Sequence, residues 1–185
     1  MNRIKPVDRN TSDESARKTF EAVNTQLGMV PIMIRTMAVA PAVVEGYLCF
    51  SDALRRGTLP HALQEQLAIA IADANACEYC LSAHTALGRR AGVADEELQA
   101  NRTGQSSDPK VDAALTFALV VLERRGGVSD ETLAAIRAAG FSDREIAEIV
   151  AHVALNVFTN YFNRVAGTEI DFPRVTSRPV ARVSI

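Results

Sequence analysis

Two cysteines and a histidine at close spacing are the residues of this chain best suited to chemistry. Cys77, Cys80 and His84 lie in the stretch Asn75–His84. On a helix each residue turns about 100°, so the three side chains fall within about 60° of one another on one stripe. The thiols can then form a disulfide, and the imidazole can exchange a proton with Cys80. The pattern predicts thiol redox chemistry first and structural zinc second.

Zinc is the weaker interpretation. A structural zinc site needs a fourth ligand and usually brings a second Cys/His pair, whereas His61, His152 and Cys49 are isolated in the sequence. Redox chemistry is also favoured by position, because the partial positive charge at a helix start lowers the pKa of a thiol. We therefore expect no metal or other cofactor and a reversible Cys77–Cys80 disulfide. Cys49 is interpreted as a small buried hydrophobe that stays reduced and reacts slowly.

Glu65 is the candidate partner of His84. It lies one position from the apolar stripe of a helix that is predicted to begin at Leu59-Pro60, and the chain is expected to reverse near Asn75. Glu65 is ten residues before that turn and His84 nine after it, so they stand at similar height in an antiparallel helix pair. A carboxylate there can hold the tautomer of the imidazole and raise its basicity. A half-exposed surface glutamate fits the pattern equally well.

The other two histidines, His61 and His152, are predicted to lie at the surface. His152 follows Glu148 by four residues in a predicted helix, which is the spacing of a helix-surface pair. His61 falls in the first turn of its helix, where a solvated role is expected. Asn160 and Tyr161, beside two phenylalanines, are compatible with packing or with a pocket wall.

The elements that position these residues are predicted to be helices. The 185 residues are 48% hydrophobic and 5% aromatic without tryptophan, and they are rich in alanine, the best helix former. Capping residues, prolines and glycines divide the chain into about eight helices in an all-α fold. The first is predicted to be capped by Thr11 and Glu14, and the last to run from Ser142 past Thr159.

The chain is predicted to be a single domain over residues 1–185. A polar loop at 102–109, punctuated by glycine and proline, suggests a loose organisation into two halves. Residues 167–185 contain Pro173 and Pro179 and alternate valine with arginine. We expect an extended C-terminal arm there, lying on a neighbour or on its own domain.

Charge and hydropathy exclude several classes of partner. The net charge is −2 with acids and bases interspersed, so the chain offers no basic surface for nucleic acid or a membrane. No apolar run approaches the roughly 20 residues of a transmembrane helix, and residues 1–6 lack the apolar segment of a signal peptide. A cytoplasmic location is expected, where paired cysteines are more often catalytic or metal-binding than structural.

Glu65, eleven residues, and then Cys77-x-x-Cys80-x-x-x-His84 resembles the core signature of the alkyl hydroperoxidase D-like (AhpD-like) proteins. These belong to the carboxymuconolactone decarboxylase superfamily, and the signature occupies about residues 59–92. The stretch 158–167 is similar to the peroxidase-related branch of that family. The resemblance implies an all-helical bundle that assembles as a homotrimer or homohexamer.

The resemblance also implies an activity. The protein would be a disulfide-cycling peroxidase in which Cys80 attacks a peroxide and Cys77 resolves the product, with His84 and Glu65 relaying the proton through water. The electrons would come from a dithiol or a protein disulfide reductant. A non-enzymatic dithiol sensor of oxidants is the alternative, and a decarboxylase ranks below both because that branch generally lacks the cysteine pair.

Two positions depart from the pattern of the family. Tyr79 stands between the cysteines where alkyl hydroperoxidase D has a histidine, and Arg164 stands where relatives often carry one. The first change affects the relay and the choice of reductant. An arginine at the second position can hold an anionic substrate or stabilise a thiolate.

Overall fold

The described chain is helical throughout. A computed structural model describes residues 2–10 and 12–178. These residues form nine helices and no strand, which confirms the all-α prediction and adds one helix to the expected number. The helices are α1 (Glu14–Leu27), α2 (Ile32–Met37), α3 (Pro41–Arg55), α4 (His61–Ala74), α5 (Glu78–Arg90), α6 (Asp95–Asn101), α7 (Pro109–Glu123), α8 (Asp130–Ala138) and α9 (Asp143–Ala166).

Local signals set the ends of the first and last helices. Asp13 caps α1 by accepting a hydrogen bond from the Ala16 amide at 2.8 Å. The predicted cap Thr11 lies outside the described residues, and the helix begins beyond it. Ser142 and Glu145 form a reciprocal capping box at the start of α9. That helix runs past Thr159, as predicted, to Ala166.

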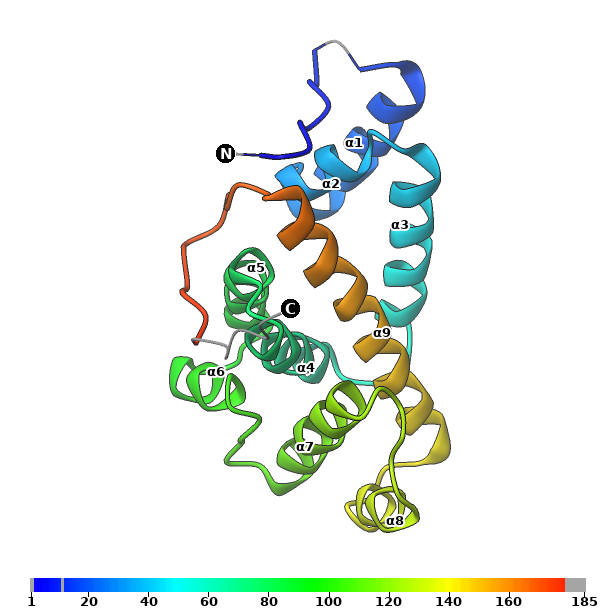
Figure 1. Ribbon diagram of the computed structural model, residues 1–185, viewed down its shortest axis with the longest axis vertical. Coiled ribbons are helices and arrows are strands. Elements are labelled where there is room, and N and C mark those ends of the chain that lie inside the picture. The colour runs from blue at the N-terminus through cyan, green and yellow to red at the C-terminus, as the bar shows by residue number, and fades with distance from the viewer. Residues whose placement is uncertain (1, 11, 179–185) are drawn as a thin grey trace, which may run out of the picture.

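Helix α4 is the centre of the molecule. Every residue from Leu63 to Asp73 is buried, so the helix is enclosed on all sides instead of on one stripe. It packs against α5, α7 and α9 (Figure 1). Its side chains contribute both to the hydrophobic cluster around α1, α2 and α5 and to the cluster around α7, α8 and α9.

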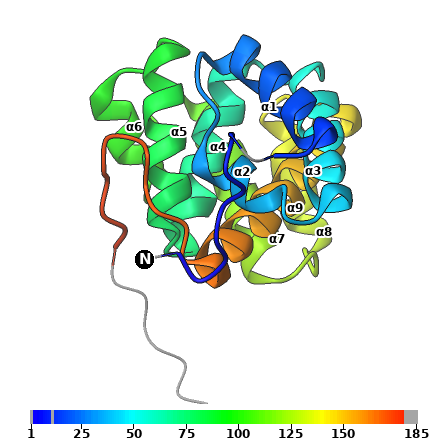
Figure 2. The same cartoon turned by 90° about the horizontal axis from the view of Figure 1, so that it is seen from above.

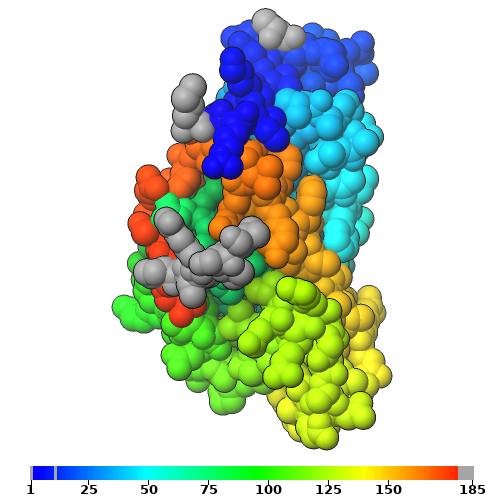
Figure 3. Space-filling view, viewed as in Figure 1, coloured from blue at the N-terminus to red at the C-terminus, as the bar shows by residue number. Residues whose placement is uncertain are grey.

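The remaining helices surround α4 and α9. Helices α1 to α3 gather at one end of the molecule, and α7 and α8 gather at the other (Figure 3). Helix α9 crosses the space between these ends, which brings its middle and last turns close to the α4–α5 pair. None of the described helices has the length and apolarity to cross a membrane.

The C-terminal arm lies on its own domain. Residues 167–178 run along the outside of α5 and α6 (Figure 2). The Val175 amide donates to Ser82 Oγ at 2.9 Å, and the Phe172 ring packs edge-on against Tyr79 at 5.9 Å. Arg178 pairs with the buried Asp73. Of the two expected placements, the structure selects the intramolecular one for the described part of the arm; residues 179–185 lie outside that part.

Candidate active site

A tight turn between α4 and α5 places the cysteines. The Cys77 amide donates to Ala72 O at 2.9 Å, and the Ala76 amide donates to Asp73 O at 3.1 Å, the paired hydrogen bonds of a Schellman ending. Ala76 has a φ of 51°, a left-handed conformation more often occupied by glycine. The turn makes Cys77 the N-cap of α5 and puts Cys80 in the first turn of that helix.

The two thiols are in contact and reduced. Their sulfur atoms are 2.9 Å apart, and the Cys80 amide donates to Cys77 Sγ at 3.4 Å. Cys77 is 1% exposed and Cys80 3%. A small movement of either side chain would bring the sulfurs to bonding distance.

Glu65 and His84 meet across the helix pair, as their equal distance from the turn predicted. His84 Nδ1 lies 2.7 Å from Glu65 Oε2. The Glu65 side chain is 10% exposed, which rules out the interpretation as a half-exposed surface glutamate. Burial opposes a charge on His84, but the adjacent carboxylate outweighs it and raises the pKa of the imidazole. His61 is half-exposed, with Nε2 3.8 Å from the other Glu65 oxygen.

The surroundings of Cys80 favour its thiolate. Burial disfavours the charge, but the hydrogen bond from Cys77, the charge of His84 and the amide of Asn163 together lower the pKa of Cys80 to about 7. The hydrogen bond to Cys80 and burial raise the pKa of Cys77. At pH 7 about half of the Cys80 side chains are therefore thiolates, each accepting a hydrogen bond from the Cys77 thiol.

Asn163 belongs to the site although sequence reasoning gave it no role. Its Nδ2 donates to Cys80 Sγ at 3.2 Å and also lies 3.1 Å from Met33 Sδ. Nearby, Asn160 Oδ1 accepts from Asn75 Nδ2 at 2.9 Å. The available signal was a set of polar residues at helical spacing (Asn156, Thr159, Asn160 and Asn163), because a buried amide needs a polar partner.

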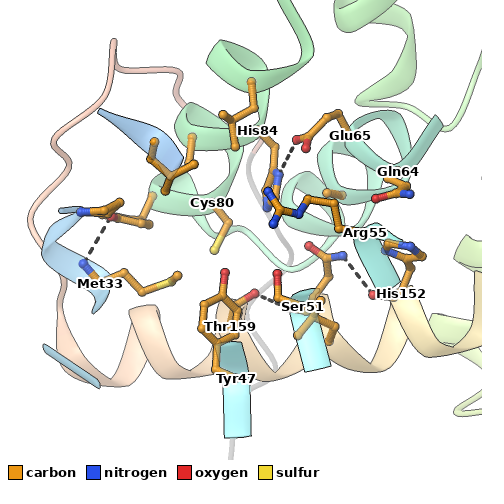
Figure 4. Close-up of a pocket in the computed structure, with 18 of the residues that line it drawn as sticks. Met33, Tyr47, Ser51, Arg55, Gln64, Glu65, Cys80, His84, His152 and Thr159 are labelled. Atoms are coloured by element: carbon orange, nitrogen blue, oxygen red, sulfur yellow. Dashed lines mark hydrogen bonds and ion pairs between the residues drawn. The ribbon is translucent and has the colours of Figure 1, made fainter. Parts of the chain in front are cut away.

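Cys80 and His84 line a cavity of about 150 Å³ (Figure 4). Glu65 also lines this cavity, and the dashed line between Glu65 and His84 in Figure 4 marks their contact. The rest of the lining is largely apolar, with hydroxyl and amide groups at intervals and the basic side chains of Arg55 and His61. It includes Pro31, Met33, Ile34, Tyr47, Ser51, Gln64, Ala68, Tyr79, Ala83, Leu87, His152, Leu155, Asn156, Thr159 and Phe172.

The surface interpretation of His152 is wrong. His152 is 5% exposed and lines the cavity, and its Nε2 has no hydrogen-bond partner among the described residues. Burial lowers its pKa, so the ring is neutral at pH 7. Glu148 instead accepts from the Thr58 amide at 2.7 Å and from the Leu59 amide at 3.1 Å. Glu148 and His152 do lie four residues apart on one helix, as predicted, but the side of α9 that carries His152 is buried.

Cys49 also differs from its prediction. It is exposed on α3, whereas it was expected to be buried and slow to react. Val44 and Leu54 are the buried residues of this helix, and Cys49 is five positions from each. Five residues correspond to about 140° around the axis, so Cys49 points away from the packed face and from the site.

Tyr79 and Arg164, the two residues that depart from the family pattern, each form a hydrogen bond with the backbone. The Tyr79 hydroxyl accepts from the Met33 amide at 3.2 Å, and burial raises its pKa, so the phenol remains protonated. Arg164 is exposed and donates from Nη1 to Asn75 O at 2.8 Å, on the turn that carries Cys77. Within the described ranges, no group of three or more His, Cys, Asp or Glu residues is arranged to hold a metal ion.

The segment that carries the site matches a known protein family. Residues 41–124 match the model of the carboxymuconolactone decarboxylase family, which confirms the resemblance for the segment that carries Glu65, both cysteines and His84. A comparison with the curated proteins gives no match.

Several solved structures share the fold. A peroxidase-related protein from Ralstonia eutropha JMP134, with an alkylhydroperoxidase AhpD core, is 24% identical with a TM-score of 0.84; the similarity covers 92% of each chain. A peroxidase-related protein from Silicibacter sp. TM1040 is 21% identical with a TM-score of 0.78, covering 90% of this chain and 92% of that one. The debrominase Bmp8 is 20% identical with a TM-score of 0.76, covering 91% and 92%. At these identities the likeness establishes the AhpD-like helical fold.

Proposed function

Starting from a chain whose residues 41–124 match the carboxymuconolactone decarboxylase family, we propose that it is a thiol-dependent peroxidase. One observation carries the proposal. The Cys80 sulfur receives a hydrogen bond from Cys77 at 2.9 Å, beside a histidine held at 2.7 Å by a buried carboxylate. This combination supplies a nucleophile, a resolving thiol and a proton donor in one enclosed place.

The reaction uses the two thiols as the source of two electrons. The Cys80 thiolate attacks one peroxide oxygen, the O–O bond breaks, and the departing alkoxide or hydroxide takes a proton from the His84 imidazolium. Cys80 is then a sulfenic acid. The Cys77 sulfur attacks it, water leaves, and the disulfide forms. Glu65 acts on His84 alone, because it fixes the ring and favours its charged form.

The cavity favours an organic hydroperoxide over hydrogen peroxide. A volume of about 150 Å³ resembles that of a protein cavity that accommodates a benzene ring. The largely apolar lining gains from burying a hydrocarbon group, at roughly 25 cal/mol per Å² of apolar surface. We therefore expect a lower KM for a hydroperoxide with a small hydrocarbon substituent than for hydrogen peroxide.

Turnover with a dithiol is the decisive experiment. The purified protein is supplied with excess dithiothreitol and either cumene hydroperoxide or hydrogen peroxide, and peroxide loss is followed against a Cys80→Ser control. Sustained consumption over many equivalents supports a peroxidase. Consumption of one equivalent followed by arrest identifies the dithiol sensor instead, and no loss above the control excludes both.

The cavity also supports a second candidate function, reductive dehalogenation. The fold is shared with a debrominase, a cysteine-to-alanine variant of which binds 2,3,4-tribromopyrrole, and the cavity of this chain has the volume of a small ring. In such a reaction the Cys80 thiolate would take the halogen, His84 would protonate the ring carbon, and Cys77 would displace halide to leave a disulfide. Release of bromide from tribromopyrrole with dithiothreitol, absent in Cys80→Ser, tests it.

A further inference from the structure

The two thiols face different spaces. Cys80 lines the cavity of about 150 Å³, whereas Cys77 lines a separate and larger pocket of about 720 Å³. The second pocket lies among the first turn of α5, the end of α9 and the start of the C-terminal arm. A molecule in it would approach the sulfur pair from the Cys77 side without passing through the cavity.

The larger pocket carries positive charge. Arg3, Arg164 and Arg174 line it together with Glu78 and Glu169. Arg174 is paired with Glu78 at 2.6 Å. Arg164 is exposed and donates to Asn75 O, and its charge reaches Cys77, where it favours ionisation of the thiol.

We propose that this pocket is the reductant site of the protein, and that it takes an anionic thiol which attacks Cys77 of the oxidised pair. This inference rests on the proposed function, because it assumes that a Cys77–Cys80 disulfide forms and must be reduced again. It assigns the two faces of the sulfur pair to different molecules: the oxidant enters beside Cys80 and the reductant beside Cys77.

The chemistry of the leaving group favours the same assignment. Thiolates attack a disulfide more readily when the sulfur that leaves is the more acidic thiol. Attack on Cys77 expels Cys80, whose thiolate is stabilised by Asn163 and by the charge of His84. Attack on Cys80 would expel Cys77, whose surroundings disfavour its thiolate.

Reduction of the disulfide takes two electrons, which two thiols of the reductant supply. The first, as a thiolate, bonds to Cys77 Sγ while the Cys77–Cys80 bond breaks and its electron pair stays on Cys80. A second thiol, from the same dithiol or from another monothiol molecule, then attacks the sulfur of the reductant in this mixed disulfide. Cys77 leaves and is protonated, the reductant becomes a disulfide, and two electrons have passed to the protein.

Trapping the mixed disulfide tests the site of attack. The full-length protein is oxidised with diamide, so that the test does not depend on peroxidase activity. It is then mixed with 2-mercaptoethanesulfonate, quenched within the first turnover with N-ethylmaleimide and mapped by mass spectrometry. We expect the sulfonate adduct on Cys77 and the maleimide on Cys80. The reverse arrangement would overturn the proposal.

A charge series tests the pocket itself. Reduction rates per thiolate are compared for mercaptoethanesulfonate, neutral 2-mercaptoethanol and cationic cysteamine. The anionic thiol should react fastest, and Arg164→Gln should slow it about 5- to 10-fold while leaving 2-mercaptoethanol nearly unchanged. Arg89→Gln is the matched control, because Arg89 pairs with Asp95 outside the pocket.

The outcomes separate this proposal from the proposed function. Equal rates for the three thiols, or an Arg164→Gln effect no larger than that of Arg89→Gln, contradicts an anionic reductant at this pocket even if peroxide is turned over. Conversely, a protein that shows the Cys77 adduct and the charge dependence after diamide, yet consumes no peroxide, retains its reductant site and loses only the peroxidase assignment.

Discussion

At the scale of single residues, His84 connects the carboxylate of Glu65 to the thiol of Cys80. It faces the same cavity as Cys80, and a carboxylate from the neighbouring helix holds its Nδ1 at 2.7 Å. The carboxylate raises the pKa of the imidazole, and the imidazolium in turn lowers the pKa of Cys80. Glu65 therefore acts on the sulfur through His84.

Replacing the members of this relay tests whether they act as a unit. We expect Glu65→Gln to slow peroxide reduction about 10- to 100-fold at pH 7, because the glutamine keeps the shape but removes the charge. His84→Ala should cost at least as much, and the double variant little more than His84→Ala alone. Stopped-flow rates of disulfide formation give all three values.

The pH profile provides the control for that experiment. Both single variants lose stabilisation of the thiolate, so their Cys80 pKa rises and their activity should recover as pH increases towards the ordinary thiol value of about 8.5. Fully additive losses, or a Glu65→Gln enzyme with the rate and pH profile of the wild type, would remove Glu65 from the mechanism.

The hydrogen bond from Asn163 leads to a separate prediction about the pKa of Cys80. Its amide donates directly to Cys80 Sγ, so Asn163→Ala should raise the pKa of Cys80 by about one unit. With a wild-type pKa of about 7, the thiolate fraction at pH 7 would fall about five-fold and the difference would vanish at high pH. Alkylation rates of Cys80 against pH measure this shift. Asn156→Ala is the matched control, because Asn156 lies on the same helix and, among the described residues, its side chain donates to the backbone of His152 and not to a sulfur. An equal shift in both variants would contradict a specific role.

At the scale of the elements, the turn between α4 and α5 joins the buried centre of the fold to the thiols. Ala76 occupies the left-handed position of the Schellman ending of α4, and the next residue, Cys77, caps α5. A left-handed conformation costs a residue with a Cβ about 1–2 kcal/mol. The chain therefore retains some strain at the residue before Cys77.

Ala76→Gly should relieve that strain. Glycine adopts a positive φ without a Cβ clash, although it loses more entropy on folding, so we expect a net gain of about 0.5–1 kcal/mol. For a domain of this size that corresponds to a rise in Tm of about 1–4 °C, measured by calorimetry on the reduced protein. Ala74→Gly, two residues earlier and still helical, should have the opposite sign. A loss of stability in both variants would show that the turn is not strained.

At the scale of the whole molecule, one stripe of α9 remains uncovered. Val150, Phe158, Tyr161 and Val165 are each more than 40% exposed. Their spacing puts them within about 80° of one another around the helix. An exposed apolar stripe of this kind is typical of an interface, which fits the homotrimer or homohexamer that the family resemblance implies.

We expect the protein to be a homo-oligomer in solution through this stripe. Phe158→Glu should weaken the assembly, because it would bury an unpaired charge at the interface. Light scattering after size exclusion gives the mass at micromolar concentration. Glu131→Gln, on the exposed start of α8, should leave the mass unchanged. A monomeric wild type, or a Phe158→Glu protein that assembles normally, would contradict this interface.

What the sequence determined by itself is local. Prolines, glycines and capping residues placed the helix ends to within a few residues, because those signals act over one turn. The stripe of Cys77, Cys80 and His84 follows from helical geometry alone. The height of Glu65 was also predictable, since a single short turn separates its helix from that of His84.

What only the tertiary structure decided depends on contacts between distant segments. Asn163 reaches Cys80 across 83 positions of sequence, and no periodicity specifies which neighbour a helix will meet. For the same reason, Cys49 was predicted to be buried and is exposed, while His152 was predicted to be at the surface and is buried. Helical spacing groups residues on one side of an element, but only the packing of α4, α5 and α9 determines which side faces the core. That packing also opens Cys77 and Cys80 to different spaces.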